Sequence, residues 1–206
     1  MTQAWAARLL HNAGIRSINP HTKYTVNNLI DSAPGFDQPL AVLKHCHDRI
    51  RKQLATLAKL SAHLPAHGAD EEAQQAAKGV LRYFTKAAPL HHEDEEINLL
   101  PELNITAQAE DAALLAQLMP QILTQHEEMA KQWQAIESQL LGIVNADTGA
   151  EASLSGTEIQ AFTELYDAHM QTEETQIAPM AKRLFSPAQM AAFGAAMQAR
   201  RGIENN

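Results

Sequence analysis

One pattern of histidine and glutamate occurs twice in this chain, and its two copies lie 78 residues apart with the same internal spacing. The first copy runs from Phe84-Thr85 through His91, Glu95 and Glu96 to Pro101, and the second from Phe162-Thr163 through His169, Glu173 and Glu174 to Pro179. A His and a Glu four residues apart lie on one face of a helix. Each copy therefore predicts a helix that presents an imidazole and a carboxylate to the same point.

A further histidine lies 44 or 43 residues before the His of each copy. These residues are His47 and His126, and each is followed at the same distance by Lys-Gln. The separation is enough for two helices joined by a loop, at a rise of about 1.5 Å per residue. The chain is thus expected to form two helical hairpins, each with a His on its first helix and a His/Glu pair on its second.

The composition favours an all-α protein. Alanine, leucine and glutamine dominate the 206 residues, aromatic residues are few, and runs of β-branched residues are missing. We expect a helix and irregular cap in residues 1–36, a four-helix domain in residues 37–185, and a C-terminal helix packed on it in residues 186–206. His11 and His21 have no partner at helical spacing and are read as ordinary residues.

Helix start and stop signals give approximate boundaries. The first expected helix begins near Asp37-Gln38-Pro39 and ends before Pro65, and the second runs from about Asp70 to Leu100 with a kink at Pro89. The third ends near Gly142, and Pro120 is expected to split off its beginning. The fourth starts with a capping box at Ser155, and a last helix runs from Ser186-Pro187 to near Gly202. Within these helices the apolar residues alternate spacings of three and four. His47, His91, His126 and His169 all fall on these apolar seams, whereas His45 does not.

Charge and cysteine content exclude several classes of protein. The net charge of −8 argues against nucleic acid and anionic membranes as partners. Cys46 is the single cysteine, so no intrachain disulfide forms, and it is read as a small residue beside the core. No signal peptide or apolar run of membrane-spanning length occurs. We expect a soluble cytoplasmic protein, with a homodimer as one open option.

Inward-facing glutamates among the four histidines point to metal. A buried carboxylate without a partner costs several kcal/mol, and no Lys or Arg shares the seams. Two divalent cations would satisfy His47, His91, Glu95, His126, His169 and Glu173 at once, with two His per cation and both Glu bridging. The donor set suits iron best, with manganese or zinc as alternatives. His92 with Glu96 is a competing pair one residue out of register, because Pro89 disturbs this helix.

These ligands and their spacing resemble the hemerythrin-like family, the HHE cation-binding domains, over residues 37–185. The resemblance implies an up-down-up-down four-helix bundle with a di-iron site, here with short helical extensions at both ends. The oxygen carriers of that family have a fifth His four residues after the one on the third helix, and an Asp five residues after the last His. Here Ala130 and Glu173 differ from that pattern. The chain is closer to bacterial iron-centre repair proteins, whose cysteine-bearing N-terminal domain it lacks, and to an iron-sensing ubiquitin-ligase subunit.

Two functions from different classes are compatible with these residues. The first is a di-iron protein that binds or senses oxygen, nitric oxide or peroxide, or that handles labile iron. The second is an oxidoreductase that consumes peroxide or oxygen, with Tyr166 as a proton or electron donor; the plainer interpretation of Tyr166 is a packed aromatic residue bonded to a ligand carboxylate. A metal-free helical interaction module is a third interpretation. His92, Glu96, Glu127 and Glu174 are either solvated residues or hydrogen-bond partners of the ligands.

Overall fold

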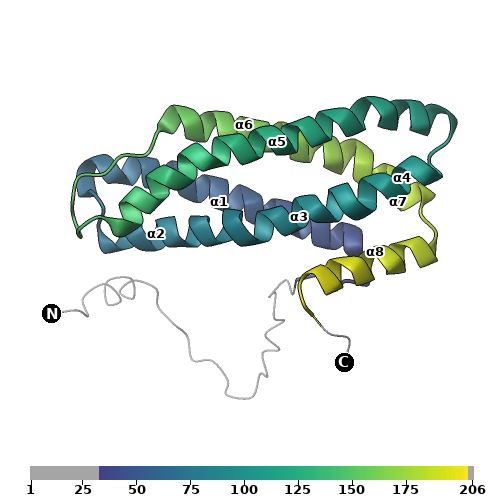
Figure 1. Ribbon diagram of the computed structural model, residues 1–206, viewed down its shortest axis with the longest axis horizontal. Coiled ribbons are helices and arrows are strands. Elements are labelled where there is room, and N and C mark those ends of the chain that lie inside the picture. The colour runs from purple at the N-terminus through teal and green to yellow at the C-terminus, as the bar shows by residue number, and fades with distance from the viewer. Residues whose placement is uncertain (1–32, 204–206) are drawn as a thin grey trace, which may run out of the picture. The chain divides into compact units, whose positions relative to one another are not determined.

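The computed structural model describes residues 33–203, and within this range the chain forms a bundle of four long antiparallel helical elements with an additional short helix (Figure 1). The first and third elements are the uninterrupted helices α1 (Pro39–His67) and α5 (Ala109–Asn145). The second and fourth are segmented. The predicted all-α bundle is therefore confirmed. The helix and cap expected in the N-terminal region fall largely on residues 1–32, outside the described residues.

The two segmented elements change helix type near the repeated pattern. The second consists of α2 (Glu71–Arg82), η1 (Tyr83–Ala87), α3 (Ala88–Asp94), η2 (Glu95–Leu99) and α4 (Leu100–Thr106). The fourth consists of α6 (Gly156–Thr172), η3 (Glu173–Ile177) and α7 (Ala178–Leu184). The η segments are π-helical turns, which are rare and often occur at functional sites.

Each π-helical turn ends two residues before a proline. The backbone N–H of the residue between them donates to the carbonyl five residues back: Ala88 to Tyr83, Leu100 to Glu95, and Ala178 to Glu173. A proline lacks an N–H and clashes with the carbonyl four residues back, and the wider turn accommodates it. The chain thus remains helical through Pro89. In both repeats the π-helical turn begins at the inward glutamate, Glu95 or Glu173.

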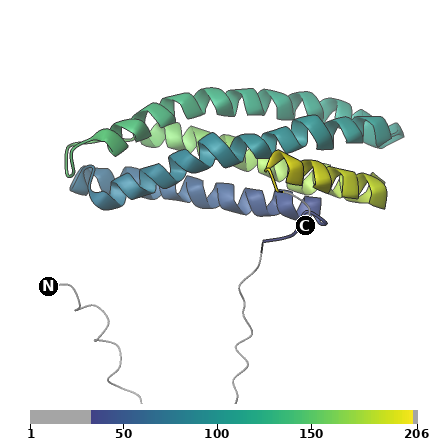
Figure 2. The same ribbon diagram turned by 60° about the horizontal axis from the view of Figure 1, so that its bottom comes forward.

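Short connections fold the four elements against one another. The α1 helix packs against α2 and α6, and α5 packs against the same two helices from the other side, which closes the bundle (Figures 1 and 2). At the first turn, Gly68 adopts a φ of 61° and ends α1. This backbone conformation suits glycine because a side chain there would be strained.

Several expected boundaries differ from the structure. Helix α1 continues through Pro65, and α5 continues through Pro120 without the expected split and ends three residues after Gly142. The second element extends to Thr106 rather than to Leu100. The first helix begins at Pro39, and the side chain of its N-cap residue, Gln38, makes no cap hydrogen bond. Propensity arguments locate such ends only approximately, because packing against neighbouring helices extends or shortens them.

The Ser155 cap forms in part. Its hydroxyl accepts from the Glu158 N–H at 3.3 Å, as expected of a cap. Its own N–H donates to Oε1 of Gln139 at 2.7 Å instead of to the Glu158 side chain, so the reciprocal half of the capping box is replaced by a contact with α5.

Two apolar clusters form the core, with a polar belt between them. One cluster contains Ile50, Phe84, Met129 and Phe162, and the other contains Leu43, Leu99, Ile122 and Ile177. Along every long element the chain passes from one cluster to the other through a predicted ligand. The six predicted ligands therefore lie in the middle of the bundle, enclosed by apolar side chains at both ends.

Helix α8 (Pro187–Arg200) covers the outside of the bundle beside α1 and α3 (Figures 1 and 2). Ser186 and Gln189 form its capping box. Gly194 faces the carbonyl oxygen of Phe36 so closely that a Cβ would collide with the backbone there. Arg200 and Arg201 at its end both bind the buried carboxylate of Asp94.

Candidate metal centre

The six residues predicted as ligands come together in the polar belt, and none of them is more than 5% exposed. They come from all four long elements: His47 from α1, His91 and Glu95 from the α3–η2 segment, His126 from α5, and His169 and Glu173 from the α6–η3 segment. His45 is half-buried on α1 and belongs to none of the clusters of metal-binding side chains formed within residues 33–203. The helical period thus separates the two neighbouring histidines of α1.

Each of the four imidazoles turns its Nε2 toward a glutamate oxygen. The distances from Nε2 to the carboxylate oxygen are 3.1 Å for His47 to Glu173, 3.1 Å for His91 to Glu95, 3.4 Å for His126 to Glu95 and 3.5 Å for His169 to Glu173. Each glutamate therefore lies between a His of its own repeat and a His of another helix. The donor atoms form two groups, His47 with His91 and His126 with His169, and both groups include Glu95 and Glu173.

The outer nitrogens of three rings are held by side-chain oxygens. Nδ1 of His47 lies 2.9 Å from Glu174, Nδ1 of His126 lies 2.6 Å from Glu96, and Nδ1 of His169 lies 3.2 Å from Gln125. A carboxylate or amide oxygen accepts a hydrogen bond, so each Nδ1 carries the proton and each Nε2 keeps its lone pair. This tautomer is the one in which Nε2 can bind a metal.

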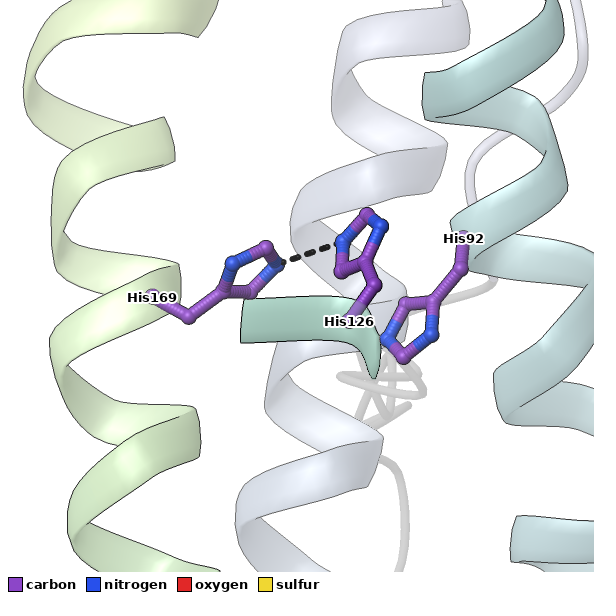
Figure 3. Close-up of side chains that lie close together, drawn as sticks. All are labelled: His92, His126 and His169. Carbon is purple, nitrogen blue, oxygen red and sulfur yellow. Dashed lines mark hydrogen bonds between the residues drawn. The ribbon is translucent and has the colours of Figure 1, made fainter. Parts of the chain in front are cut away.

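The lone pairs of His126 and His169 face each other. Their Nε2 atoms are 3.2 Å apart, as the dashed line in Figure 3 marks. Because both Nδ1 atoms already hold their protons, two neutral rings would bring two acceptors into contact. A shared cation removes this conflict.

Burial disfavours charge on the imidazoles. Burial lowers the pKa of His91 well below its ordinary value, with further lowering from the neighbouring histidines. Burial also lowers the pKa of His169 to about 4, although nearby Glu173 raises it. Both rings are therefore neutral near pH 7, which is the form that binds metal.

The two glutamates respond differently to the same environment. Burial, and then repulsion from Glu173, raise the pKa of Glu95 well above its ordinary value. Burial also acts to raise the pKa of Glu173, but His169 and His47 outweigh it, and this pKa is lowered. The pKa values of the two neighbouring carboxyl groups are thus shifted in opposite directions.

Most of the donor atoms at the centre suit a metal because they have no hydrogen-bond partners among the described residues. Both carboxylate oxygens of Glu95 and of Glu173, Nε2 of His47 and both ring nitrogens of His91 are buried and make no hydrogen bond with the described residues. Buried polar atoms are normally satisfied, and an unsatisfied one costs about 1–3 kcal/mol. A cluster of unpartnered nitrogen and oxygen donors, closed off by apolar residues, suits divalent cations.

Several residues around this centre could not be identified from the sequence pattern. Asp94 is fully buried, and its partners Arg200 and Arg201 lie at the C-terminal end of α8. Gln125 precedes His126, but nothing in the sequence indicates that it contacts His169 across the bundle. His92, which the sequence pattern left as a competing ligand candidate, lies beside His126 with the ring centroids 4.1 Å apart.

Glu96 and Glu174 contact His126 and His47, two of the predicted ligands, and are not merely solvated residues, although the side chain of Glu96 is 42% exposed. Tyr166 packs against both Phe84 and Phe162. Among residues 33–203 its hydroxyl makes no hydrogen bond to a ligand carboxylate, which the plainer interpretation had expected.

In the part of the chain that the structure describes, no helix is both long and apolar enough to cross a membrane. A protein of Haemophilus influenzae described as uncharacterized is 27% identical over 169 residues, which cover 82% of this chain and 93% of that relative. Residues 38–181 match the family described as the hemerythrin HHE cation binding domain. This match spans the four long elements that supply the buried histidines and glutamates. The chain therefore belongs to the hemerythrin HHE cation-binding domain family and is a metal-binding protein.

Proposed function

We propose that this protein holds a pair of iron ions through His47, His91, His126 and His169, with Glu95 and Glu173 as bridges between them. It uses this centre to bind or sense oxygen, nitric oxide or peroxide, or to handle labile iron in the cytoplasm. The observation that carries the proposal is the set of buried donor atoms without hydrogen-bond partners at the centre of the bundle.

The assignment of two cations rests on the grouping of the donors. Four histidines and two glutamates are too many for a single tetrahedral site. Glu95 and Glu173 each take part in both donor groups, as bridging carboxylates would. Each cation then receives two imidazoles and shares two carboxylates with its neighbour.

Iron is preferred because imidazole and carboxylate donors in a dry helical bundle suit it, and manganese and zinc remain the alternatives. A pair of iron ions supplies electron exchange with a small bound ligand. The protein orients the imidazole rings and excludes bulk water. Glu174, Glu96 and Gln125 hold the rings with Nε2 inward, and the apolar clusters at both ends keep bulk water from the centre.

Two cavities give small ligands a way toward the centre. One has a volume of about 530 Å³ and is bounded by His92, His126, Ala130, Trp133 and Tyr166 among others. The other has a volume of about 350 Å³ and reaches His47 and Glu173. Both are large enough for a diatomic molecule or peroxide.

An oxidoreductase that consumes peroxide or oxygen is the second candidate. It is favoured by Tyr166, which lines the larger cavity together with His92 and His126. Burial raises the pKa of Tyr166, so its hydroxyl keeps its proton near neutral pH and can donate it. Peroxide consumption by the iron-loaded protein that falls in Tyr166→Phe would support this function, and absence of turnover would leave the binding function.

The test of the first proposal is metal analysis combined with absorption spectroscopy on protein purified from its own source, with and without oxygen. We expect two iron ions per chain and a near-ultraviolet absorption that changes on exposure to oxygen. Zinc in the same positions would give no such absorption. A protein that takes up no metal from iron, manganese or zinc solutions would contradict the proposal.

A further inference from the structure

His92 lies beside the six proposed ligands and contributes nothing to that set. Its Nε2 is buried and has no hydrogen-bond partner among the described residues. Its ring stacks on that of His126, with centroids 4.1 Å apart and planes 10° from parallel. An unpartnered buried nitrogen at this position calls for a physical reason.

The two neighbouring histidines of α3 face different parts of the centre. The second element packs against α1 on one side and α5 on the other. Successive residues of a helix are about 100° apart around its axis. His91 accordingly contacts His47 of α1, with ring centroids 4.9 Å apart, whereas His92 contacts His126 of α5.

Three imidazoles from three helices converge on this side. Figure 3 shows His92, His126 and His169 approaching from α3, α5 and α6. One ring nitrogen of each can be chosen so that all three lie within 4.8 Å of one another. Imidazole nitrogens gathered this closely are a common metal-binding arrangement.

We infer that His92 is a fifth imidazole ligand, bound to the cation that His126 and His169 hold. This inference rests on the two-cation centre proposed above. The cation of His126 and His169 then has three imidazoles and the two shared carboxylates. The cation of His47 and His91 has two imidazoles and the same carboxylates, so it keeps more positions open for an incoming ligand.

The position of Ala130 supports this assignment. Ala130 lies one helical turn after His126 and lines the same 530 Å³ cavity as His92, and its methyl group offers no donor. Helix α5 thus offers no second imidazole at position 130, and the adjacent helix α3 offers the ring of His92 on the same side. His92 and His126 both line this cavity.

A packing role for the His92 ring is the competing explanation, and paired substitutions separate the two. His92→Phe keeps an aromatic ring against His126 and removes the nitrogens. His92→Ala removes both the ring and the nitrogens. His45→Ala is the matched control, because His45 is a half-buried histidine that belongs to no donor cluster among the described residues.

The experiment is Co²⁺ titration of the metal-free full-length protein in competition with a chelator. All proteins carry His67→Ala, which removes one member of the separate His63, His67 and Asp70 cluster so that surface binding does not add to the count. We expect the protein that keeps His92 to bind two Co²⁺ ions per chain. In both His92 variants, the affinity for one of these two ions should fall by roughly 100-fold or more. The His45→Ala protein should retain both affinities.

Two further readouts decide between ligand and packing residue. Free imidazole should restore the weakened equivalent in His92→Ala, which leaves an opening to the cavity, but not in His92→Phe. With ¹⁵N-labelled histidine, the Co²⁺-loaded protein with His92 should show five imidazoles with the large contact shift of a nitrogen bound directly to Co²⁺, and His92→Phe should show four.

Full Co²⁺ affinity in His92→Phe, or four shifted imidazoles with His92 present, would overturn the assignment while leaving the two-cation centre intact. Fewer than two equivalents in the protein with His92 would instead overturn the proposed centre itself. The two failures are thus distinguishable.

Discussion

Oε1 of Glu174 lies 2.9 Å from Nδ1 of His47, so a glutamate of the second repeat orients a histidine at the start of the first. The reciprocal contact joins Glu96 of the first repeat to Nδ1 of His126, at 2.6 Å. The second glutamate of each copy therefore acts across the bundle. This exchange explains why the pattern contains two adjacent glutamates although only one of each pair faces the centre.

We predict that Glu174→Ala weakens metal binding by about 10–100-fold, because the ring of His47 loses the bond that sets its tautomer and orientation. Glu174→Gln, whose amide oxygen can still accept from Nδ1, should lose less. Chelator competition measures both. Glu164→Ala, on an exposed position of α6, is the control. Equal affinities in Glu174→Ala and the control would show that His47 is held by packing alone.

His45 and His47, two residues apart on α1, should differ sharply in their effect on metal content. We predict that His47→Ala loses metal from the centre, since this ring is buried with its Nε2 toward Glu173. His45→Ala should remain fully loaded. Metal analysis of both purified variants is the measurement, and equal metal loss in both would refute the assignment of His47 over His45.

Metal removal should lower the melting temperature. A ligand that binds only the folded state at a free concentration about 100 times its Kd stabilises that state by about 2.7 kcal/mol. For a domain of this size, that corresponds to roughly 5–10 °C. Calorimetry on loaded and chelator-treated protein measures the difference. An unchanged melting temperature in protein verified as metal-free would mean that the six residues are satisfied in another way.

The metal-free protein should lose stability as the pH falls from about 6.5 to about 4. Burial lowers the pKa of His169 in the folded state to about 4, and the unfolded value is about 6.5. Between these values the unfolded chain binds more protons, so acid favours unfolding. The contribution of one such histidine is about 3 kcal/mol. Urea unfolding at several pH values measures how the free energy of unfolding changes with pH. This change should be smaller in His169→Gln, and an equal change in both proteins would contradict the prediction.

The contact between Asp94 and α8 should stabilise the fold. Asp94 is fully buried, and removing it leaves Arg200 and Arg201 without their shared partner. We predict that Asp94→Ala lowers the free energy of unfolding by about 3 kcal/mol. Asp111→Ala, which breaks an exposed pair with Arg183, should have a much smaller effect. Denaturant unfolding tests both, and similar losses would mean that burial of Asp94 is not important.

Local periodicity accounts for what could be predicted from the sequence by itself. The helical character, the hairpin repeat and the inward face shared by His91 and Glu95 all depend on residues within one or two turns of each other. The helical period determines such relationships before any tertiary contact forms. The same reasoning distinguishes His47 from His45, because one lies on an apolar seam and the other does not.

Contacts between helices distant in sequence were decided only by the tertiary structure. Three such contacts depend on how each helix is rotated against its neighbours. They are the pairing of Glu174 with His47, the binding of Asp94 by the arginines at the end of α8, and the stacking of His92 on His126. Pro120 remains inside α5 while Pro89 follows a π-helical turn, although both are prolines in a helical pattern. A repeat in the sequence determines which faces turn inward, but the side chains that meet there depend on the packing of all four helices, which local periodicity does not contain.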